Sequence, residues 1–540
     1  MTHLSSELRV ALVVRSKTIW HWQLQLIQSL CESSLIDIQS VVVVEGEMVE
    51  IPYLVKKFHQ LDAAVFSTPM PAFDEVDIDV LATNYPYAQW VRARDRDSIA
   101  ALNADILINL SEQPLSAALQ SLPTLGTLET YFSSQGELRS DDFAIAEYLA
   151  GGKQVSVAVV LQDPKQNTYV LADMQPSLEG GSISRNLSQY WRWIAYLWQR
   201  SCQSILQHGK HIKQVSSRRL EPTSGTACTT ITPLQSIQLY QRLLMHMGAK
   251  LKQKYLDKEQ WVLLVKHSSK HSSKHASIDP LAPDFSSFHE LVPPADCFWA
   301  DPFVFSHKGR DYVFFEALPF ATEKGHLCAM ELFSDGHHSE PVVIIQEAHH
   351  LSYPNVFEYQ SEHYLIPESG DHGTVDLYRC TQFPYQWQYE KTLMQDIHAY
   401  DATLLEYQGR WWLFASVAPK LGLSACETLQ VFFADSPVSD HWQAHPSNPI
   451  ISDASTARPG GQFFVKDEQL YRVSQDCAGQ YGAGININQV TTLNETSYSE
   501  QLIRCHYPEW DQRLIALHTF NFNANLAVAD ALRVTTKRLL

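Results

Sequence analysis

The feature of this sequence that most constrains its fold is a weak repeat that begins near residue 285 and continues to the end of the chain. Short runs rich in Phe, Tyr, Trp and Val alternate there with Gly, Pro, Asp and Ser turns, at a spacing of about 45 to 55 residues. A unit of this size cannot bury both faces of its own strands. Five such units therefore predict an all-β five-bladed propeller over residues 285–540, in which apolar faces stack blade on blade. The units cover residues 298–318, 352–380, 399–417, 457–490 and 514–532.

Acidic residues recur at the strands that would line the central funnel of this propeller. Asp301, Asn355 and Asp401 lie near the same relative position of three units, and Glu316 and Glu368 each end an apolar run. A Glu at the end of an apolar strand is unfavourable unless it lines a functional site or pairs with Arg. Glycosyl transfer and hydrolysis both need paired carboxyl groups, one ionised and one with a raised pKa. We therefore expect Asp301, Glu368 and Asp401 to be catalytic. The alternative is that Asp301 caps a turn and that the Glu residues pair with nearby arginines.

Further polar and aromatic residues are expected around the same funnel. A cluster of cations suits a phosphate or a uronate as well as a neutral sugar, and an indole can stack on a sugar ring. The alternative is structural, with arginines that tie neighbouring blades together. The candidate substrate-binding residues are Glu316, Asn355, Arg458, Arg472, Gln475, Asp476, His518 and Trp299.

Several motifs of this part of the chain also carry a family resemblance. Ala-Asp-Pro-Phe at residue 300, Ser-Tyr-Pro-Asn-Val-Phe at residue 352, Ile-Pro-Glu-Ser at residue 366 and the run from Arg472 to Gly482 resemble the N-terminal domain of plant glucosamine inositolphosphorylceramide transferase. That domain is similar to the five-bladed propellers of glycoside hydrolase families 43 and 32. The family 43 pattern implies Asp301 as general base, Asp401 as the residue that tunes pKa and Glu368 as general acid. The match does not include the plant transferase domain, so it does not imply ceramide glycosylation.

The N-terminal third has a different, α/β rhythm. Apolar runs at residues 10–14, 36–45 and 104–110 alternate with helical spacing such as that of residues 20–31. This order predicts a parallel sheet with right-handed crossovers. Neither GxGxxG nor GxxxxGK[ST] accompanies it, so no dinucleotide or nucleotide phosphate cradle is expected.

Residues 8–210 resemble the formyltransferase fold of the methionyl-tRNA formyltransferase type. Gly126 matches the Gly that precedes Asn-x-His in that family, whereas Glu129 and Tyr131 stand at the positions of the Asn and the His. A neutral Tyr cannot replace His as acid and base near pH 7. The resemblance therefore implies a degenerate formyltransferase-like domain over residues 1–210 that docks or presents a substrate.

The segment between these bodies, residues 211–284, is expected to be a linker with helical and low-complexity parts. It contains the tract KHSSKHSSKHAS, whose three His are four residues apart. On a helix these rings could bind a metal, but few apolar groups are present to order the tract, so we expect an exposed loop. We predict no metal and no cofactor for the chain.

Composition limits the partners of this 540-residue chain. A formal net charge of −18 argues against broad nucleic-acid binding. No apolar stretch approaches the ~20 residues of a membrane span. Nine scattered Cys without a CxxC pair indicate neither a zinc site nor a disulfide framework, so a cytoplasmic protein is expected.

Together these patterns predict a carbohydrate-active protein whose substrate is a sugar or nucleotide-sugar. Glycosyl transfer in the synthesis of a bacterial surface polysaccharide or glycoconjugate, with possible polysaccharide-assembly partners, is the favoured function. No Asp-x-Asp stands out as a metal-binding motif that would hold a nucleotide-sugar in the usual way, which weakens the case for transfer. The alternatives are a glycoside hydrolase of the family 43/32 type and a non-catalytic glycan-binding or scaffold protein.

Overall fold

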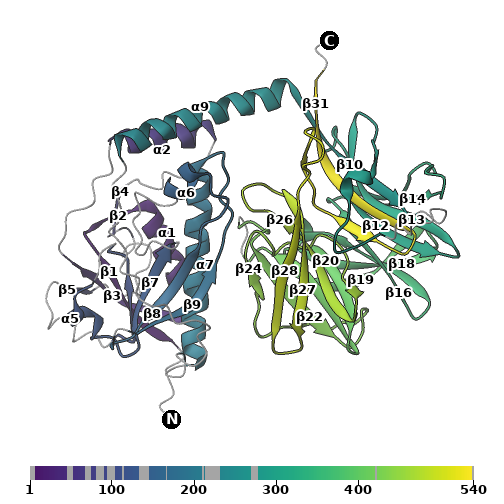
Figure 1. The fold of residues 1–540 in the computed structure, drawn as a ribbon. Coiled ribbons are helices and arrows are strands. Elements are labelled where there is room, and N and C mark those ends of the chain that lie inside the picture. The colour runs from purple at the N-terminus through teal and green to yellow at the C-terminus, as the bar shows by residue number, and fades with distance from the viewer. Residues whose placement is uncertain are drawn as a thin grey trace. The chain divides into compact units, whose positions relative to one another are not determined.

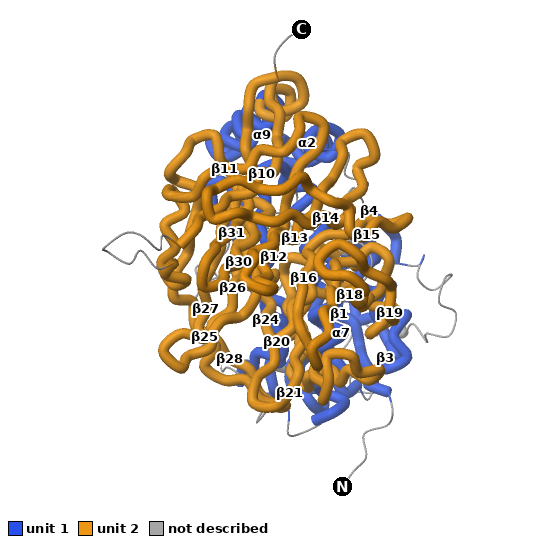
Figure 2. The backbone as a smooth tube through the Cα atoms, turned by 90° about the vertical axis from the view of Figure 1, so that its right-hand side faces the viewer, with its two compact units in different colours: residues 1–248 blue, residues 249–540 orange. Residues whose placement is uncertain are grey.

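The structure of the chain is a computed structural model, and it describes residues 7–44, 53–66, 75–78, 80, 91–93, 104–111, 115–132, 145–165, 167–208, 212, 232–268, 278–419 and 423–537. The chain divides into two compact units, residues 1–248 and 249–540, coloured separately in Figure 2. None of the helices in this described part is long and apolar enough to cross a membrane.

The first unit is built on a seven-stranded sheet (Figure 1) with the order β5-β3-β1-β6-β7-β8-β9. Neighbours from β5 to β7 are parallel, and β8 and β9 continue the sheet antiparallel. β1 is almost wholly buried, as expected of a parallel strand covered on both faces. The strands are β1 (Leu8–Val14), β3 (Ile36–Val43), β5 (Val91–Ala93), β6 (Ile106–Asn109), β7 (Gly126–Phe132), β8 (Val157–Gln162) and β9 (Thr168–Met174).

Helices pack on this sheet, and the longest, α7 (Ile183–His208), contacts both β8 and β9. Its buried face includes Trp193 and Trp198, and the Trp198 indole donates a hydrogen bond of 2.7 Å to the Thr130 hydroxyl on β7. The α/β character predicted for this unit is therefore confirmed, whereas its likeness to the formyltransferase fold stays a prediction. The other elements are α1 (His21–Cys31), α2 (Tyr53–Val65), α5 (Ala117–Gln120), α6 (Ile145–Ala150) and the short pair β2 (Thr18–Trp20) and β4 (Glu75–Asp77).

The three residues compared with the formyltransferase motif all lie on β7. A Cβ atom on Gly126 would lie 2.3 Å from the Gln162 carbonyl oxygen, so close strand packing explains this glycine. The Tyr131 hydroxyl donates to a Glu129 carboxylate oxygen at 3.4 Å, and Asn109 donates to the other oxygen at 3.1 Å. Glu129 and Tyr131, the two residues at the positions of the Asn and the His of that motif, therefore contact each other.

The second unit contains five separate sheets, which form the blades of the predicted propeller. Contacts run between the first strands of successive blades, β12 to β16 and β16 to β20, so these strands lie innermost. Blade 1 holds β12 (Cys297–His307), β13 (Arg310–Pro319), β14 (His326–Leu332) and β15 (Val342–Ile345), and blade 2 holds β16 (Ser352–Tyr359), β17 (Glu362–Glu368), β18 (Thr374–Gln382) and β19 (Gln386–Gln395). Blade 3 holds β20 (Ala399–Tyr407), β21 (Arg410–Val417), β22 (Thr428–Ala434), β23 (Gln443–Ala444) and β24 (Ile451–Ser452), and blade 4 holds β25 (Phe464–Lys466), β26 (Gln469–Asp476), β27 (Gly484–Leu493) and β28 (Tyr498–His506).

The fifth blade joins the two ends of this unit and so closes the ring. β10 (Asp257–His267) pairs with β31 (Leu526–Thr536) along its whole length, and β11 (His289–Leu291), β29 (Leu514–Ala516) and β30 (Phe520–Phe522) complete the sheet. The segment predicted as a linker thus contains α9 (Pro233–Tyr255) and a propeller strand. His267 lies on β10, while the remainder of the His tract, residues 269–277, lies outside the described residues.

The blades are held together by apolar side chains packed between neighbouring sheets. Between blades 1 and 2, Phe303 and Tyr353 lie edge to face with ring centroids 4.8 Å apart. Between blades 3 and 4, Phe414 packs against Phe463 at 4.6 Å. This packing buries the alternating aromatic residues of the repeat, as the sequence pattern indicates.

Candidate functional site

Three inner strands share a backbone irregularity, a bulge near the beginning of the strand. The register of each strand shifts between residues 300 and 303, 352 and 355, and 400 and 403. Within these bulges Asp301, Tyr353 and Asp401 take φ values of 52°, 45° and 53°. Left-handed backbone at a non-Gly residue costs about 1–3 kcal/mol and gathers at functional sites. Tyr353, rather than Asn355, is therefore the blade 2 counterpart of the two acids.

Asp401 belongs to a buried group that we call the arginine cluster: Arg458, Asp401, Glu368 and Gln475. The Arg458 Nε atom donates to the Asp401 carboxylate at 2.6 Å, and the Gln475 amide donates to the same oxygen at 2.9 Å. Glu368 accepts from the Asp401 backbone N–H at 3.1 Å, and its carboxyl lies 3.4 Å from Arg458 Nη2. Side chains from blades 2, 3 and 4 thus meet around one guanidinium.

Burial controls the charge of this cluster. It raises the pKa of Glu368 well above its ordinary value, and the neighbouring Asp401 charge raises it further, so both effects favour the protonated form of this carboxyl group. Arg458 keeps its charge despite burial, because Asp401 lies beside it. The Arg458 guanidinium also lies 5.0 Å from the Tyr481 ring and 5.6 Å from the Tyr400 ring, at cation–π distance.

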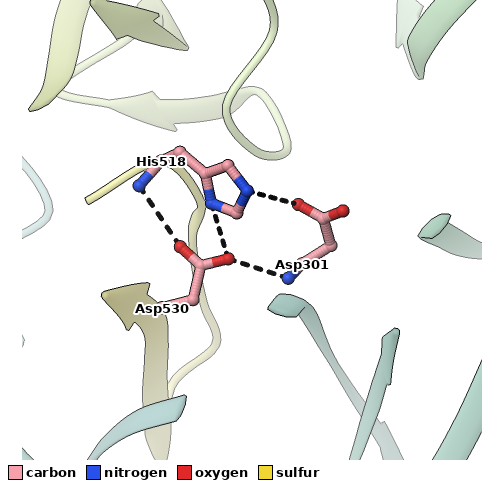
Figure 3. Close-up of side chains that lie close together, drawn as sticks. All are labelled: Asp301, His518 and Asp530. Atoms are coloured by element: carbon pink, nitrogen blue, oxygen red, sulfur yellow. Dashed lines mark hydrogen bonds and ion pairs between the residues drawn. The ribbon is translucent and has the colours of Figure 1, made fainter. Parts of the chain in front are cut away.

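A second buried group, the histidine cluster, is formed by Asp301, His518, Asp530 and Thr519. Figure 3 shows the first three of these side chains. His518 Nδ1 lies 2.7 Å from one Asp530 oxygen, and His518 Nε2 lies 3.6 Å from Asp301. The same Asp530 oxygen accepts the Asp301 backbone N–H at 2.8 Å, and the Thr519 hydroxyl donates to the Asp301 carboxylate at 2.8 Å. The imidazole therefore stands between two carboxylates.

The charges of the histidine cluster depend on one another. Burial raises the pKa of Asp301 to about 6, although the charged His518 opposes this shift. Burial disfavours the His518 cation, but Asp530 and then Asp301 raise its pKa to about 9. At pH 7 the imidazole is thus protonated and Asp301 is mostly ionised. Trp261 of β10 stacks on the His518 ring, with centroids 4.1 Å apart.

The two clusters interact across the ring. The Asp401 charge contributes to the raised pKa of Asp301, and the Asp301 charge contributes to that of Glu368. The structure therefore brings Asp301, Glu368 and Asp401 into one buried set of interacting carboxyl groups, as the sequence predicts. We call the two clusters together the axial site.

Known proteins resemble this unit. Residues 269–515 match the family model described as "Glucosamine inositolphosphorylceramide transferase 1, N-terminal". The chain is 37% identical over 206 residues to the protein of that name from Oryza sativa subsp. japonica, and 35% identical over 206 residues to the one from Arabidopsis thaliana. The alignments cover 38% of this chain and 27% of each relative. The chain thus spans about a quarter of the length of these curated relatives. The resemblance of this region that the sequence indicates is confirmed.

Solved structures with similarity to the chain include glycoside hydrolases. One is Zg3597, a family 117 glycoside hydrolase of Zobellia galactanivorans, at 12% identity and a TM-score of 0.31, covering 44% of this chain and 85% of that one. Another is an exo-1,5-alpha-L-arabinanase from a bovine ruminal metagenomic library, at 13% identity and a TM-score of 0.30, covering 40% and 86%.

Two other predicted site residues lie close to the axial site. Glu316 of β13 is buried, and its Oε1 atom lies 3.3 Å from His350 Nε2. Burial and the Asp301 charge raise the pKa of Glu316 well above its ordinary value. Asn355 is buried and donates to the Ala402 carbonyl at 3.2 Å, which ties blade 2 to blade 3.

The structure gives other roles to the remaining predicted residues. The Arg472 guanidinium binds Glu500 of the outer strand β28 at 2.6 and 2.7 Å, so it ties strands of blade 4 together. Trp299 is buried among core side chains, with its ring 5.1 Å from that of Phe315. Both side chains thus make contacts within the scaffold, and their role as substrate-binding residues stays a prediction. Asp476 accepts a hydrogen bond of 2.6 Å from the Tyr507 hydroxyl.

Sequence reasoning missed two members of the axial site, Asp530 and Thr519, and two aromatic residues outside the clusters, Tyr353 and Tyr481. Asp530 lies within the apolar run of β31, which is the signal that singled out Glu316 and Glu368. Tyr353 could not be found in this way, because the residues at the corresponding position of blades 1 and 3 are acids. No sequence pattern around Thr519 or Tyr481 indicates a site.

The histidine cluster is also the one group of at least three potential metal ligands among the described residues. Ligand atoms of Asp301, His518 and Asp530 lie within 4.8 Å of one another. Both ring nitrogens of His518 face carboxylates, so a cation there would have to displace an imidazole proton. As it stands, the arrangement is that of a shared-proton network.

Proposed function

We propose that the axial site catalyses glycosyl transfer from a sugar or nucleotide-sugar donor, in the synthesis of a bacterial surface polysaccharide or glycoconjugate. The observation that carries this proposal is the different surroundings of two buried carboxyl groups. Asp301 lies 3.6 Å from the His518 ring and its pKa is raised to about 6, whereas the pKa of Glu368 is raised well above its ordinary value by burial and by the charge of Asp401. We therefore expect Asp301 to be mostly ionised at pH 7 and Glu368 to hold a proton. One general base and one general acid are what the reaction requires.

The proposed reaction follows from these charges. Asp301 accepts the proton of the attacking hydroxyl, whose oxygen bonds to the anomeric carbon as the donor bond breaks. Glu368 supplies its proton to the leaving oxygen. Asp401 and Arg458 hold the Glu368 carboxyl through the 3.1 Å and 3.4 Å contacts, which fixes the direction of that proton. His518 compensates the charge of Asp301 before the proton arrives.

The names of the relatives support transfer over hydrolysis. Both plant relatives are named glucosamine inositolphosphorylceramide transferases. The residues that match the family model, 269–515, include the axial residues of blades 1 to 4. Under this proposal the first unit presents a substrate or an assembly partner, and the protein works in the cytoplasm, where nucleotide-sugars are made available.

The test is a screen of the full chain with nucleotide-sugars plus glycan acceptors, and in parallel with aryl glycosides. We expect transfer products from the wild type and none from Asp301→Asn or Glu368→Gln, both of which should remain folded by circular dichroism. Glu358→Gln on β16, where the carboxylate is exposed, is the matched control and should keep full activity. Release of aryl alcohols without transfer would make the protein a hydrolase. Sugar binding that survives both variants, without turnover of any substrate, would make it a binding module.

A further inference from the structure

Two thiols from neighbouring blades meet beside the arginine cluster. Cys426 lies just before β22 of blade 3, and Cys477 lies just after β26 of blade 4. Cys426 Sγ lies 3.9 Å from the Arg458 Nη1 atom, and the two thiols are close enough for each to shift the pKa of the other. Cys477 Sγ in turn lies 3.9 Å from the Gln475 side-chain oxygen. The pair is therefore in contact with two members of the arginine cluster.

The surroundings of the two sulfur atoms make them chemically unlike. The interaction with Cys477, together with the Arg458 charge and Ser424, lowers the pKa of Cys426 to about 6, although partial desolvation acts in the opposite direction. The same interaction and burial raise the pKa of Cys477 well above its ordinary value. Burial also raises the pKa of the adjacent Glu427 to about 8, so that carboxyl is largely uncharged at pH 7 and does not oppose a thiolate.

Exposure sets the order in which the two sulfur atoms can react. Cys426 is partly exposed, whereas Cys477 is 3% exposed. A reagent from solution therefore meets Cys426 first, and Cys477 can act only on what is already attached to its neighbour. An accessible thiolate backed by a second thiol is the arrangement of a nucleophilic and a resolving cysteine.

We propose that Cys426 is a modification site for low-molecular-weight disulfides, and that Cys477 resolves the product into a disulfide that bridges blades 3 and 4. In the first step the Cys426 thiolate attacks one sulfur of the disulfide, and a small thiolate leaves. In the second step the Cys477 sulfur attacks Cys426 Sγ and releases the second small thiol, which takes the Cys477 proton. The protein loses two hydrogens, and the small disulfide is reduced to two thiols.

The bridge would change the arginine cluster without any change in its own residues. The Cys426 thiolate beside the Arg458 Nη1 atom would lose its negative charge on forming the disulfide. The contact between Cys477 Sγ and the Gln475 side-chain oxygen would also end. Arg458 and Gln475 both donate to the Asp401 carboxylate. The modification site therefore has a direct route to the axial site, but its chemistry does not depend on the proposed function.

The test uses the full chain with glutathione disulfide at pH 7, followed by intact mass measurement and peptide mapping. We expect the wild type to lose two hydrogens, retain no glutathione and return to its starting mass with dithiothreitol. Cys477→Ser should stop at a mixed disulfide between glutathione and Cys426. Cys426→Ser should form neither product. Circular dichroism of both variants establishes that the fold is kept.

Cys297 provides an internal control of the same exposure class. It is partly exposed like Cys426, but burial raises its pKa. Per-site labelling by iodoacetamide at pH 7 should be at least about 10-fold faster at Cys426, since thiolate content outweighs the lower nucleophilicity of an acidic thiol. Equal labelling rates at the two sites, or a Cys477→Ser variant that accumulates no mixed disulfide, would overturn the proposal.

Discussion

The arginine cluster and the histidine cluster both stabilise buried carboxylates, but they do so with different cations. Each places one cation among buried carboxyl groups, and each starts from a left-handed residue in a bulged inner strand, Asp401 in one and Asp301 in the other. A guanidinium stays charged at every physiological pH, whereas an imidazolium can lose its proton. The comparison teaches that one half of the axial site is electrostatically fixed and the other half can titrate.

The two cations also differ in how closely they contact the carboxylate of the bulged strand. Arg458 binds Asp401 through a hydrogen bond of 2.6 Å, with a second carboxyl group at 3.4 Å. His518 is instead held by Asp530 at 2.7 Å and stands 3.6 Å from Asp301. The weaker contact leaves the Asp301 carboxylate more available to a substrate than that of Asp401.

The largest effect is expected when the fixed cation is removed. Arg458→Met leaves the buried Asp401 carboxylate without its cation, which should lower the free energy of unfolding by about 3–5 kcal/mol. Urea titration measures this change. The matched control is Arg410→Met, because Arg410 pairs with Asp435 and Glu495 near the surface, where such pairs contribute at most about 1 kcal/mol. Equal losses in the two variants would mean that the buried pair has no special weight.

An intermediate, pH-dependent effect is expected for the titrating cation. The pKa of His518 is raised from 6.5 to about 9 in the folded chain, so its contribution to stability is complete below pH 6.5 and is lost as the pH rises through 9. The wild type should therefore exceed His518→Asn in free energy of unfolding by up to about 3 kcal/mol near pH 6. This advantage should fall toward zero above pH 9.

The control for this profile is His363→Asn, because burial lowers the pKa of His363 and its loss should give no such slope. A constant difference between wild type and His518→Asn from pH 6 to pH 10 would show that His518 is neutral in the folded chain.

The smallest effect is expected at the blade 2 counterpart of the two acids. The Tyr353 hydroxyl shares a hydrogen bond of 2.9 Å with Thr403, so Tyr353→Phe should lose about 1 kcal/mol of stability. A double-mutant cycle with Thr403→Val isolates this bond. If the coupling exceeded about 3 kcal/mol, Tyr353 would have to be counted with the charged clusters rather than with the scaffold.

Sequence reasoning could predict the propeller because each blade repeats the same alternation of aromatic and turn residues, which local pattern alone encodes. It could also single out Asp301, Glu368 and Asp401, since carboxylates beside apolar runs are unusual. It could not predict their partners. Arg458 and Asp401 are far apart in the chain and meet because blades stack, a tertiary effect without a local signature.

Features that the sequence does not predict have equally physical causes. Residue type alone suggests Arg472 and Trp299 as site residues, but it does not show that the first contacts Glu500 and that the second packs in the core. The fifth blade begins before residue 285 because β10 pairs with the distant β31, and a pairing over that separation leaves no mark on composition. The alternation of strands and helices in the first unit can be predicted from the spacing of its apolar residues and the length of its apolar runs. These patterns do not determine which α/β family the unit resembles.

The central claim is that Glu368 is protonated at neutral pH while Asp301, in the same buried set, is ionised. Carbon-13 NMR of protein labelled at Asp and Glu carboxyl carbons tests it, with signals assigned by Glu368→Gln and Asp301→Asn. The account predicts that the Asp301 signal titrates near pH 6 and that the Glu368 signal keeps its protonated position through pH 7. A Glu368 carboxyl that ionises at its ordinary pKa, together with Asp301, would contradict it.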